Sequence, residues 1–104
     1  MPQSRSERTP VVEADVTDIG VVLTIRGELD KAAGEVLVRT TARVVTDPPS
    51  RLDIDLCSLT GFTGEGASAL VRCRELCTGL SEGLHYRTGR GPGRDALLAA
   101  YADS

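Results

Sequence analysis

The sequence predicts an α/β domain in which a mixed β-sheet of about four strands is flanked by three main α-helices. Two observations predict this class. Segments with the apolar alternation of strands are followed by segments with the apolar spacing of helices, in the order β-β-α-β-α-β-α. The chain has 104 residues, which is enough for one domain but too few for two independent cores.

A short tail and a β-hairpin come first. Residues 1–10 are polar, include two prolines and show no apolar periodicity, so we expect a disordered tail and a folded domain over residues 11–104. Two apolar segments, 11–16 and 21–26, are typical of strands. The intervening Asp18-Ile19-Gly20 favours a turn, so the two strands are predicted to form a hairpin.

The first helix and the next strand follow. Asp30 predicts a helix start, because its side chain can accept a hydrogen bond from a free backbone N–H. Helical spacing then continues from Ala33 to Val44, and residues 47–50, which include two prolines, end the helix. Apolar residues alternate with aspartates over residues 52–56, which predicts a strand.

The last elements are a helix, a strand and a helix. The second helix is predicted to end at Gly79 or Gly83. Its apolar face consists of Leu70, Cys73, Cys77 and Leu80. Residues 84–87 are predicted to form a short strand, and Pro92 suits the first turn of the last helix. The apolar side of this helix consists of Leu97, Leu98 and Tyr101.

Composition excludes several classes of function. Twelve basic and 15 acidic residues give a net charge of −3, which argues against a protein that binds DNA or RNA. The arginines are scattered and form no concentrated patch in the sequence. They include Arg26, Arg39, Arg51, Arg72 and Arg87. No apolar segment approaches the roughly 20 residues of a membrane span, and three cysteines without a secretory signal favour a reducing compartment. We therefore expect a cytoplasmic protein without a membrane partner.

Metal binding and catalysis have weak support. Cys73 and Cys77 are one helical turn apart and could bind the same metal ion. Cys57 and His85 would then be the further ligands. A structural zinc site needs four converging ligands, whereas the two helical cysteines belong to an apolar face, so we interpret them as core residues. A single histidine with no nucleophile beside it in the sequence predicts no catalytic triad. We expect His85 to point outward from its strand, and we expect no metal, no cofactor and no enzymatic activity.

A glycine-rich segment, residues 88–94, precedes the last helix and resembles a phosphate-binding loop. It lacks the Gly-Lys-Ser/Thr ending of a P-loop, so a turn before a proline-started helix is the simpler interpretation. Nucleotide binding by Gly89 to Arg94 stays an alternative function.

Three short motifs suggest a family. Gly27-Glu28-Leu29-Asp30 ends an apolar strand, residues 52–57 form a later strand, and residues 62–66 form a turn before a helix. In this combination the chain resembles the STAS-domain family, specifically the bacterial anti-sigma-factor antagonists, over about residues 11–101. The turn in that family reads Phe-Ile-Asp-Ser-Ser-Gly, and this chain has one residue fewer between its phenylalanine and its glycine.

The resemblance implies a regulatory function. In that family the unphosphorylated antagonist binds an anti-sigma factor with a kinase-type ATPase fold, and the sigma factor is released. The kinase reverses this by phosphorylating a serine at the start of the second helix. Counting back from Gly66 places that serine at Glu65, the serine before it at Gly64 and the aspartate at Thr63. The chain departs from the family pattern at all three positions.

The resemblance also implies the residues that contact the partner. They are Asp30, Thr63, Gly64, Glu65 and Gly66. Glutamate has no hydroxyl group to form the phosphate ester of phosphoserine, and its single charge partly copies that residue, which carries about −1.5 to −2. The functional hypothesis is therefore a domain locked in one state. The simpler interpretation is that Asp30 and Thr63 cap their helices and that Glu65 interacts favourably with a helix dipole, by about 0.3–1 kcal/mol.

Other roles stay open within this resemblance. Thr63, Ser58 and Ser68 are candidate surrogate phosphorylation sites, and Thr63 is preferred among them. A STAS domain without the serine could instead be a scaffold subunit, as a homodimer or in an assembly with other STAS proteins.

Overall fold

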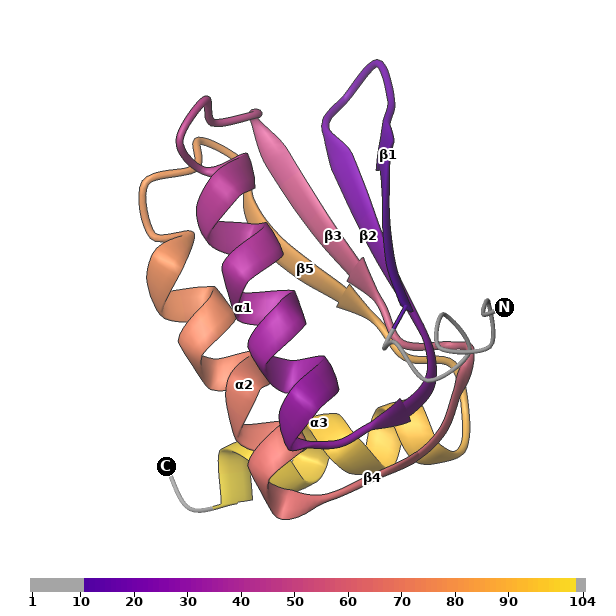
Figure 1. The fold of residues 1–104 in the computed structure, drawn as a ribbon. Coiled ribbons are helices and arrows are strands. Elements are labelled where there is room, and N and C mark those ends of the chain that lie inside the picture. Colours follow the sequence, from indigo (N-terminus) through magenta and orange to yellow (C-terminus); the bar gives the residue numbers. More distant parts are fainter. Residues whose placement is uncertain (1–10, 103–104) are drawn as a thin grey trace, which may run out of the picture.

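The computed structural model describes residues 11–102, and it places three helices against a mixed sheet (Figure 1). The strands are β1 (Val11–Val16), β2 (Val21–Leu29), β3 (Arg51–Asp55), β4 (Leu59–Phe62) and β5 (Gly83–Arg87). The helices are α1 (Lys31–Val44), α2 (Gly64–Leu76) and α3 (Pro92–Ala102). The tail predicted for residues 1–10 lies outside the described residues, as do the last two residues of the chain.

The sheet is organised around β2. The strand order is β1-β2-β3-β5, in which β1 is antiparallel to β2 and the other pairs are parallel. The first half of β2 pairs with β3, and its last residues, Gly27 to Leu29, pair with β4. The register shifts between Gly27 and Glu28, and Gly27 has a φ of +86°, which glycine adopts without strain. Because β3 and β4 follow one another along β2, the ends of β2 and β4 come together.

The core lies between the sheet and the helices. Alternate residues of β2 and β3 are completely buried, and helices α1 and α2 lie side by side over them (Figure 1). The sheet contributes Leu23, Ile25, Leu52 and Ile54, and the helices contribute Leu37, Thr41, Leu70 and Cys73. The Thr41 hydroxyl lies 3.5 Å from the Cys73 sulfur, so its polar atom has a partner inside the core. The alternation seen in the sequence therefore identified the buried face of the sheet.

The predicted fold class is confirmed, with three differences in detail. The described residues contain five strands, because Leu59–Phe62 forms β4 where the sequence indicated only a turn. Helix α2 ends at Leu76, so Cys77 and Leu80 lie beyond it, although both are buried. Leu98 is 61% exposed, which makes its prediction as part of the apolar side of α3 wrong.

Helix α3 has a different inner face because it crosses the end of the sheet (Figure 1). Its buried residues are Gly93 and Ala96, and a Cβ at Gly93 would overlap the carbonyl oxygen of Leu56. Tyr101, which the sequence placed on the apolar side, is half-buried. Its hydroxyl accepts a hydrogen bond of 2.8 Å from Nε of Arg74 on α2. Small residues therefore let α3 approach the sheet, while Tyr101 joins it to α2.

His85 is exposed on its strand and Cys73 and Cys77 are buried, as predicted, although Cys77 follows the end of α2 and Cys57 follows the end of β3. Cys57 is exposed, Cys73 and Cys77 are buried, and all three are free thiols. His85 is exposed on β5, and its Nε2 lies 3.0 Å from the carbonyl oxygen of Glu82. Within residues 11–102, no cluster of His, Cys, Asp or Glu is suited to a metal ion, and no helix is long and apolar enough to span a bilayer.

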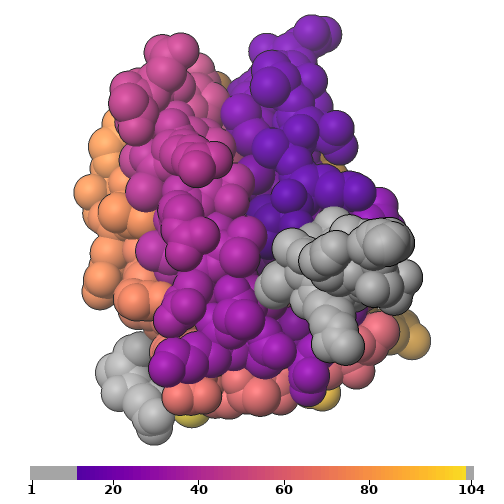
Figure 2. Space-filling view, in the orientation of Figure 1, coloured from indigo at the N-terminus to yellow at the C-terminus, as the bar shows by residue number. Residues whose placement is uncertain are grey.

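The hairpin of β1 and β2 projects beyond the rest of the sheet. Figure 2 shows its tip separated by a hollow from the chain that follows α1. That hollow is lined by residues 16–21 of the hairpin together with Pro49 and Ser50. Two apolar side chains of the tip, Val16 and Ile19, are 84% and 61% exposed. The hairpin tip thus exposes two large aliphatic side chains to solvent.

Candidate functional site

Two helix N-termini lie together at one end of the sheet. Leu29, the last residue of β2, pairs with Phe62, the last residue of β4, and each strand leads directly into a helix. The backbone N–H of Thr63 donates to the carbonyl oxygen of Leu29 across 3.0 Å. As a result Asp30 and Thr63, the residues before α1 and α2, are neighbours although they are far apart in the sequence.

Asp30 caps α1, as the sequence predicted. Its backbone is extended, with φ −100° and ψ −170°, and its Oδ1 accepts a hydrogen bond of 2.9 Å from the backbone N–H of Ala33. Its carbonyl oxygen accepts from the N–H of Gly34 at 2.8 Å. The carboxylate thus satisfies a donor that the helix leaves without a partner, and its negative charge lies at the positive end of the helix dipole.

Thr63 caps α2 in the same manner, which confirms its predicted structural role. Its backbone is extended, with φ −113° and ψ 165°. Its Oγ1 accepts a hydrogen bond of 3.1 Å from the N–H of Gly66, and its carbonyl oxygen accepts from Ala67 at 2.9 Å. The threonine is half-buried and its hydroxyl oxygen is already engaged in the cap. The first turn of α2 is therefore held firmly against the end of β2.

Gly66 is the point of closest approach between α2 and the sheet. A Cβ at this position would overlap the carbonyl oxygen of Leu29 and would lie 2.9 Å from the carbonyl oxygen of Asp30. Only glycine leaves room for this backbone approach. The family pattern supplied the position of Gly66, and the structure supplies its physical reason.

Gly34 has a similar role that sequence reasoning missed. It is buried on α1, and a Cβ there would lie 3.0 Å from Cβ of Ala69 and 3.4 Å from Cα of Gly66 on α2. The two helices therefore touch through small residues just after their caps. A glycine inside a helical pattern was the available signal, because such a glycine destabilises a helix unless close packing compensates for the loss.

Glu65 lies in the first turn of α2, where the functional hypothesis requires it. It is exposed, and within residues 11–102 no ion pair holds its carboxylate. Its carbonyl oxygen accepts a hydrogen bond of 2.9 Å from the Ser68 hydroxyl. Gly64 is also exposed and has open space where a Cβ would point. Gly64 and Glu65, which the sequence resemblance aligned with two serines, are thus both accessible at the surface.

A shallow groove begins at Glu65 and runs over the three helices. Its volume is about 440 Å³, and both signs of charge line it. Its charged residues are Lys31 and Glu35 of α1 and Glu65 and Arg72 of α2. Such a surface can recognise a partner by complementary charges, and the opposing signs leave it without a strong net attraction for either nucleic acid or cations.

The other candidate phosphorylation sites differ in their surroundings. Ser68 is exposed one turn into α2. Ser58 is exposed before β4, at the opposite end of that strand from Thr63, and its carbonyl oxygen accepts from Gly27 at 3.3 Å. Thr63 and Ser68 therefore belong to the α2 N-terminus, while Ser58 does not.

The glycine-rich loop before α3 is explained by local conformation. Gly89 and Gly91 have φ values of +59° and +90°, in the left-handed region that favours glycine. Gly93 packs against Leu56, as described above. Pro92 is the first residue of α3, as predicted. Each of these residues has a structural reason that does not involve a nucleotide.

Comparisons with known proteins match this architecture. An anti-sigma factor antagonist from Mycobacterium paratuberculosis is similar in structure, with a TM-score of 0.72 and 24% identity, over 86% of this chain and 74% of that one. SpoIIAA, an anti-sigma factor antagonist solved in its unphosphorylated form, has a TM-score of 0.63 and 20% identity, over 85% of this chain and 81% of its own. A protein named Mglu has a TM-score of 0.61 and 10% identity, over 74% of this chain but 23% of its own.

The sequence by itself matches no protein-family model and no curated protein. The structural matches nevertheless confirm the predicted STAS-like fold, which this chain shares with two anti-sigma factor antagonists over most of its length.

Proposed function

We propose that this protein is an anti-sigma-factor antagonist that binds an anti-sigma factor through the joined N-termini of α1 and α2. The observation that carries the proposal is the convergence of Asp30 with Thr63, Gly64, Glu65 and Gly66 in a fold shared with two antagonists. The sequence resemblance had implied the same five positions. The partner expected for this surface is an anti-sigma factor with a kinase-type ATPase fold.

We further propose that phosphorylation at the usual position does not control this protein. Glu65 occupies that position, and glutamate has no hydroxyl group on which a serine kinase could form a phosphate ester. The side chain is exposed and free of ion pairs with residues 11–102, so its charge is available to a partner. Two locked states follow from this. A partner surface that tolerates the charge leaves the antagonist always active, and one that rejects it leaves the antagonist always inactive.

The charge difference separates Glu65 from a full copy of phosphoserine. Phosphoserine has three acceptor oxygens and about −1.5 to −2 charge, whereas glutamate has two oxygens and one charge. The helix N-terminus beside it favours an anion, so part of the charge of Glu65 is stabilised by α2 itself. We therefore expect Glu65 to affect partner binding less than a phosphoserine at the same position would.

Calorimetric binding to the kinase-fold anti-sigma factors of the same genome tests the proposal. The wild type is compared with Glu65→Ser, each with ADP and then with ATP. Glu75→Ser is the matched control, because Glu75 is also exposed on α2 but lies near the C-terminal end of the helix. We expect binding by the wild type, by Glu65→Ser or by both, and Glu75→Ser should behave as the wild type.

Each outcome has a distinct meaning. Tight binding of the wild type with both nucleotides indicates an antagonist that is always active. Binding by Glu65→Ser alone indicates that the natural chain copies the inactive form. With ATP, mass spectrometry should then find a phosphoryl group on the Glu65→Ser variant and none on the wild type. If neither protein binds any candidate although both are folded, the antagonist role is wrong and a scaffold role takes its place.

A further inference from the structure

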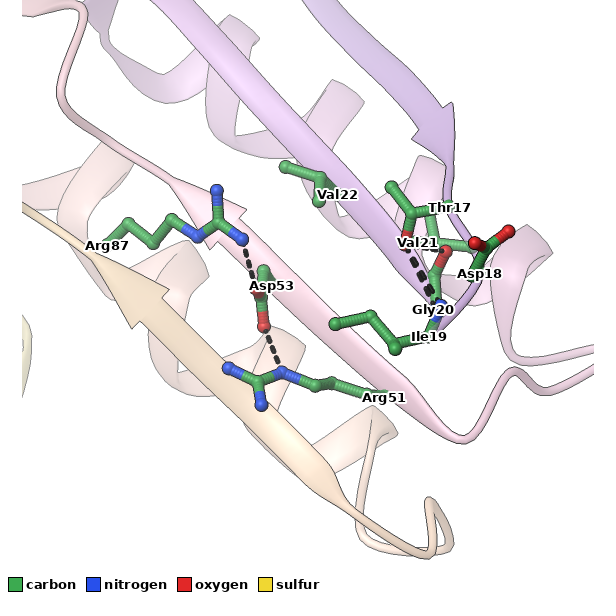
Figure 3. Close-up of a pocket in the computed structure, with 9 residues that line it drawn as sticks. All are labelled: Thr17, Asp18, Ile19, Gly20, Val21, Val22, Arg51, Asp53 and Arg87. Carbon is green, nitrogen blue, oxygen red and sulfur yellow. Dashed lines mark hydrogen bonds and ion pairs between the residues drawn. The ribbon is translucent and has the colours of Figure 1, made fainter.

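A second surface feature lies at the opposite end of β2 from the α2 N-terminus. It is a pocket of about 250 Å³ on the face of the sheet that the helices do not cover. Residues 17–22 of the hairpin form one wall, and Arg51, Asp53 and Arg87 form the other (Figure 3). Because Leu52 and Ile54 point into the core, their neighbours Arg51 and Asp53 point to this outer face.

Asp53 is the buried centre of the charged wall. Its side chain is 4% exposed, and both carboxylate oxygens are used. Nε of Arg51 donates to Oδ1 across 2.8 Å, and Nη2 of Arg87 donates to Oδ2 across 2.7 Å. Burial by itself raises the pKa of Asp53, but the hydrogen bonds and charges of Arg51 and Arg87 outweigh it and lower the pKa below 3.8. Asp53 is thus an anion at neutral pH, and the three residues together carry one net positive charge.

The two guanidinium groups keep most of their donors. A guanidinium has five N–H groups, and each of these arginines uses one nitrogen on Asp53. Neither donates to a second side chain among residues 11–102. The Arg51 and Arg87 side chains are 33% and 50% exposed, so the remaining N–H groups are open to a ligand. A planar guanidinium is well matched to the two oxygens of a carboxylate or phosphate.

The opposite wall contains the apolar residues Ile19, Val21 and Val22 beside Thr17 and Asp18, and it is held in place. Figure 3 shows the Ile19 side chain extending from the turn toward Arg51, with Val22 beside the pocket and the Asp18 carboxylate directed away from both guanidiniums. The Thr17 hydroxyl oxygen accepts from the N–H of Ile19 at 3.3 Å and of Gly20 at 3.2 Å. A Cβ at Gly20 would overlap the carbonyl oxygen of Arg51, so the turn packs directly on β3. The fold thus positions an exposed aliphatic side chain opposite two cations.

We propose that this pocket binds a small organic anion, whose carboxylate or phosphate group accepts hydrogen bonds from Arg51 and Arg87 and whose short aliphatic part contacts Ile19 and Val22. The volume lies just below the roughly 300–1,000 Å³ typical of ligand sites, which limits the aliphatic part to a few carbon atoms. The proposal does not depend on the function of the α2 N-terminus. It concerns other residues, at the other end of the sheet.

The test is a titration followed by two-dimensional ¹H–¹⁵N NMR, with three probes: 3-methylbutanoate, its neutral counterpart 3-methylbutanamide, and inorganic phosphate. We expect 3-methylbutanoate to give saturable shifts at residues 17–22 and at Arg51 and Arg87. The amide has nearly the same shape without the charge, and it should bind at least tenfold more weakly. Phosphate should shift the NMR signals of Arg51 and Arg87. Tighter binding of 3-methylbutanoate than of phosphate would show the contribution of the aliphatic wall.

Variants separate a ligand site from a purely structural ion pair. Arg87→Gln leaves Arg51 on Asp53 and should weaken binding of 3-methylbutanoate about tenfold. Arg26→Gln is the matched control, because Arg26 is exposed and pairs with Glu13 outside the pocket, so this variant should bind as the wild type does. Ile19→Ser should weaken the binding of 3-methylbutanoate more than the binding of phosphate. Because Ile19 is exposed, this variant should still fold.

Either of two kinds of result would overturn the proposal: the absence of anion binding, or binding that does not depend on the anion's charge or on Arg87. One is the lack of saturable shifts with either anion in the folded wild type, which would leave the arginines with the single role of neutralising Asp53. The other is equal binding of 3-methylbutanoate and its amide, or equal loss in Arg87→Gln and Arg26→Gln. The spectrum of each variant shows directly whether it is folded, so a loss of binding through unfolding is recognised.

Discussion

Gly66 packs against the carbonyl group of Leu29 so closely that a side chain at Gly66 would overlap its oxygen atom. This contact joins the start of α2 to the end of β2. It lies beside both helix caps, since Thr63 donates to the same carbonyl oxygen and Asp30 follows Leu29 in the chain. The proposed partner surface therefore depends on a backbone-to-backbone contact.

Replacing Gly66 tests the importance of this contact. We expect Gly66→Ala to lower the free energy of unfolding by about 1–3 kcal/mol, because the added methyl group must displace either α2 or the end of β2. Urea denaturation measures the change. Gly64→Ala is the control, since nothing lies within 4 Å of a Cβ there, and the free energy of unfolding should stay equal or rise by up to about 1 kcal/mol. Similar losses in the two variants would contradict this account.

The Thr63 cap leads to a second prediction. Thr63→Ala removes the hydroxyl that accepts the Gly66 N–H, and it should lower the free energy of unfolding by about 1 kcal/mol. Thr63→Ser keeps an acceptor oxygen in the same place and should recover most of that loss. Urea denaturation of the three proteins provides the comparison. A serine variant as unstable as the alanine variant would show that the methyl group of Thr63, and not its hydroxyl, holds the turn.

The ion pairs of Asp53 predict a dependence of stability on pH. Since its pKa in the folded protein is lower than the ordinary value of 3.8, its contribution to stability is present above about pH 3.8 and is lost as the pH falls through the folded pKa. We compare the wild type with Asp53→Asn by urea denaturation between pH 7 and pH 2.5. The advantage of the wild type should be constant near neutral pH and should shrink below pH 4. An advantage that grows in acid would refute the assignment.

The cysteines differ in predicted reactivity. Cys57 is exposed while Cys73 and Cys77 are buried, so a thiol reagent should modify one cysteine in the folded protein and three in urea. The neighbouring Asp55 carboxylate is the main cause that raises the pKa of the Cys57 thiol, with burial a smaller one. Asp55→Asn should therefore speed the modification of Cys57 at pH 8, where the thiolate fraction limits the rate. An unchanged rate would exclude this effect of Asp55.

Local patterns predicted most of the elements because they reflect short-range physics. Alternation over residues 11–16, 21–26 and 52–56 and helical spacing after Asp30 depend on which side chains face the core. The elements that were missed depend on distant contacts. Leu59–Phe62 is a strand because it pairs with the end of β2, and α3 exposes Leu98 because the helix crosses the end of the sheet instead of lying along it.

The sequence by itself determined the α/β class, the two helix caps and the departure from the family pattern at Glu65. The class follows from the order of local patterns along the chain, and the caps and Glu65 are each recognised from a few adjacent residues. Only the tertiary structure decided which distant residues meet. Pairing of Leu29 with Phe62 joined Asp30 to the α2 N-terminus. The parallel pairing of β3 with β5 brought Arg87 to Asp53 beside Arg51, although the arginines are scattered in the sequence. The register of paired strands determines which distant residues become neighbours, and register depends on contacts between residues far apart in the chain.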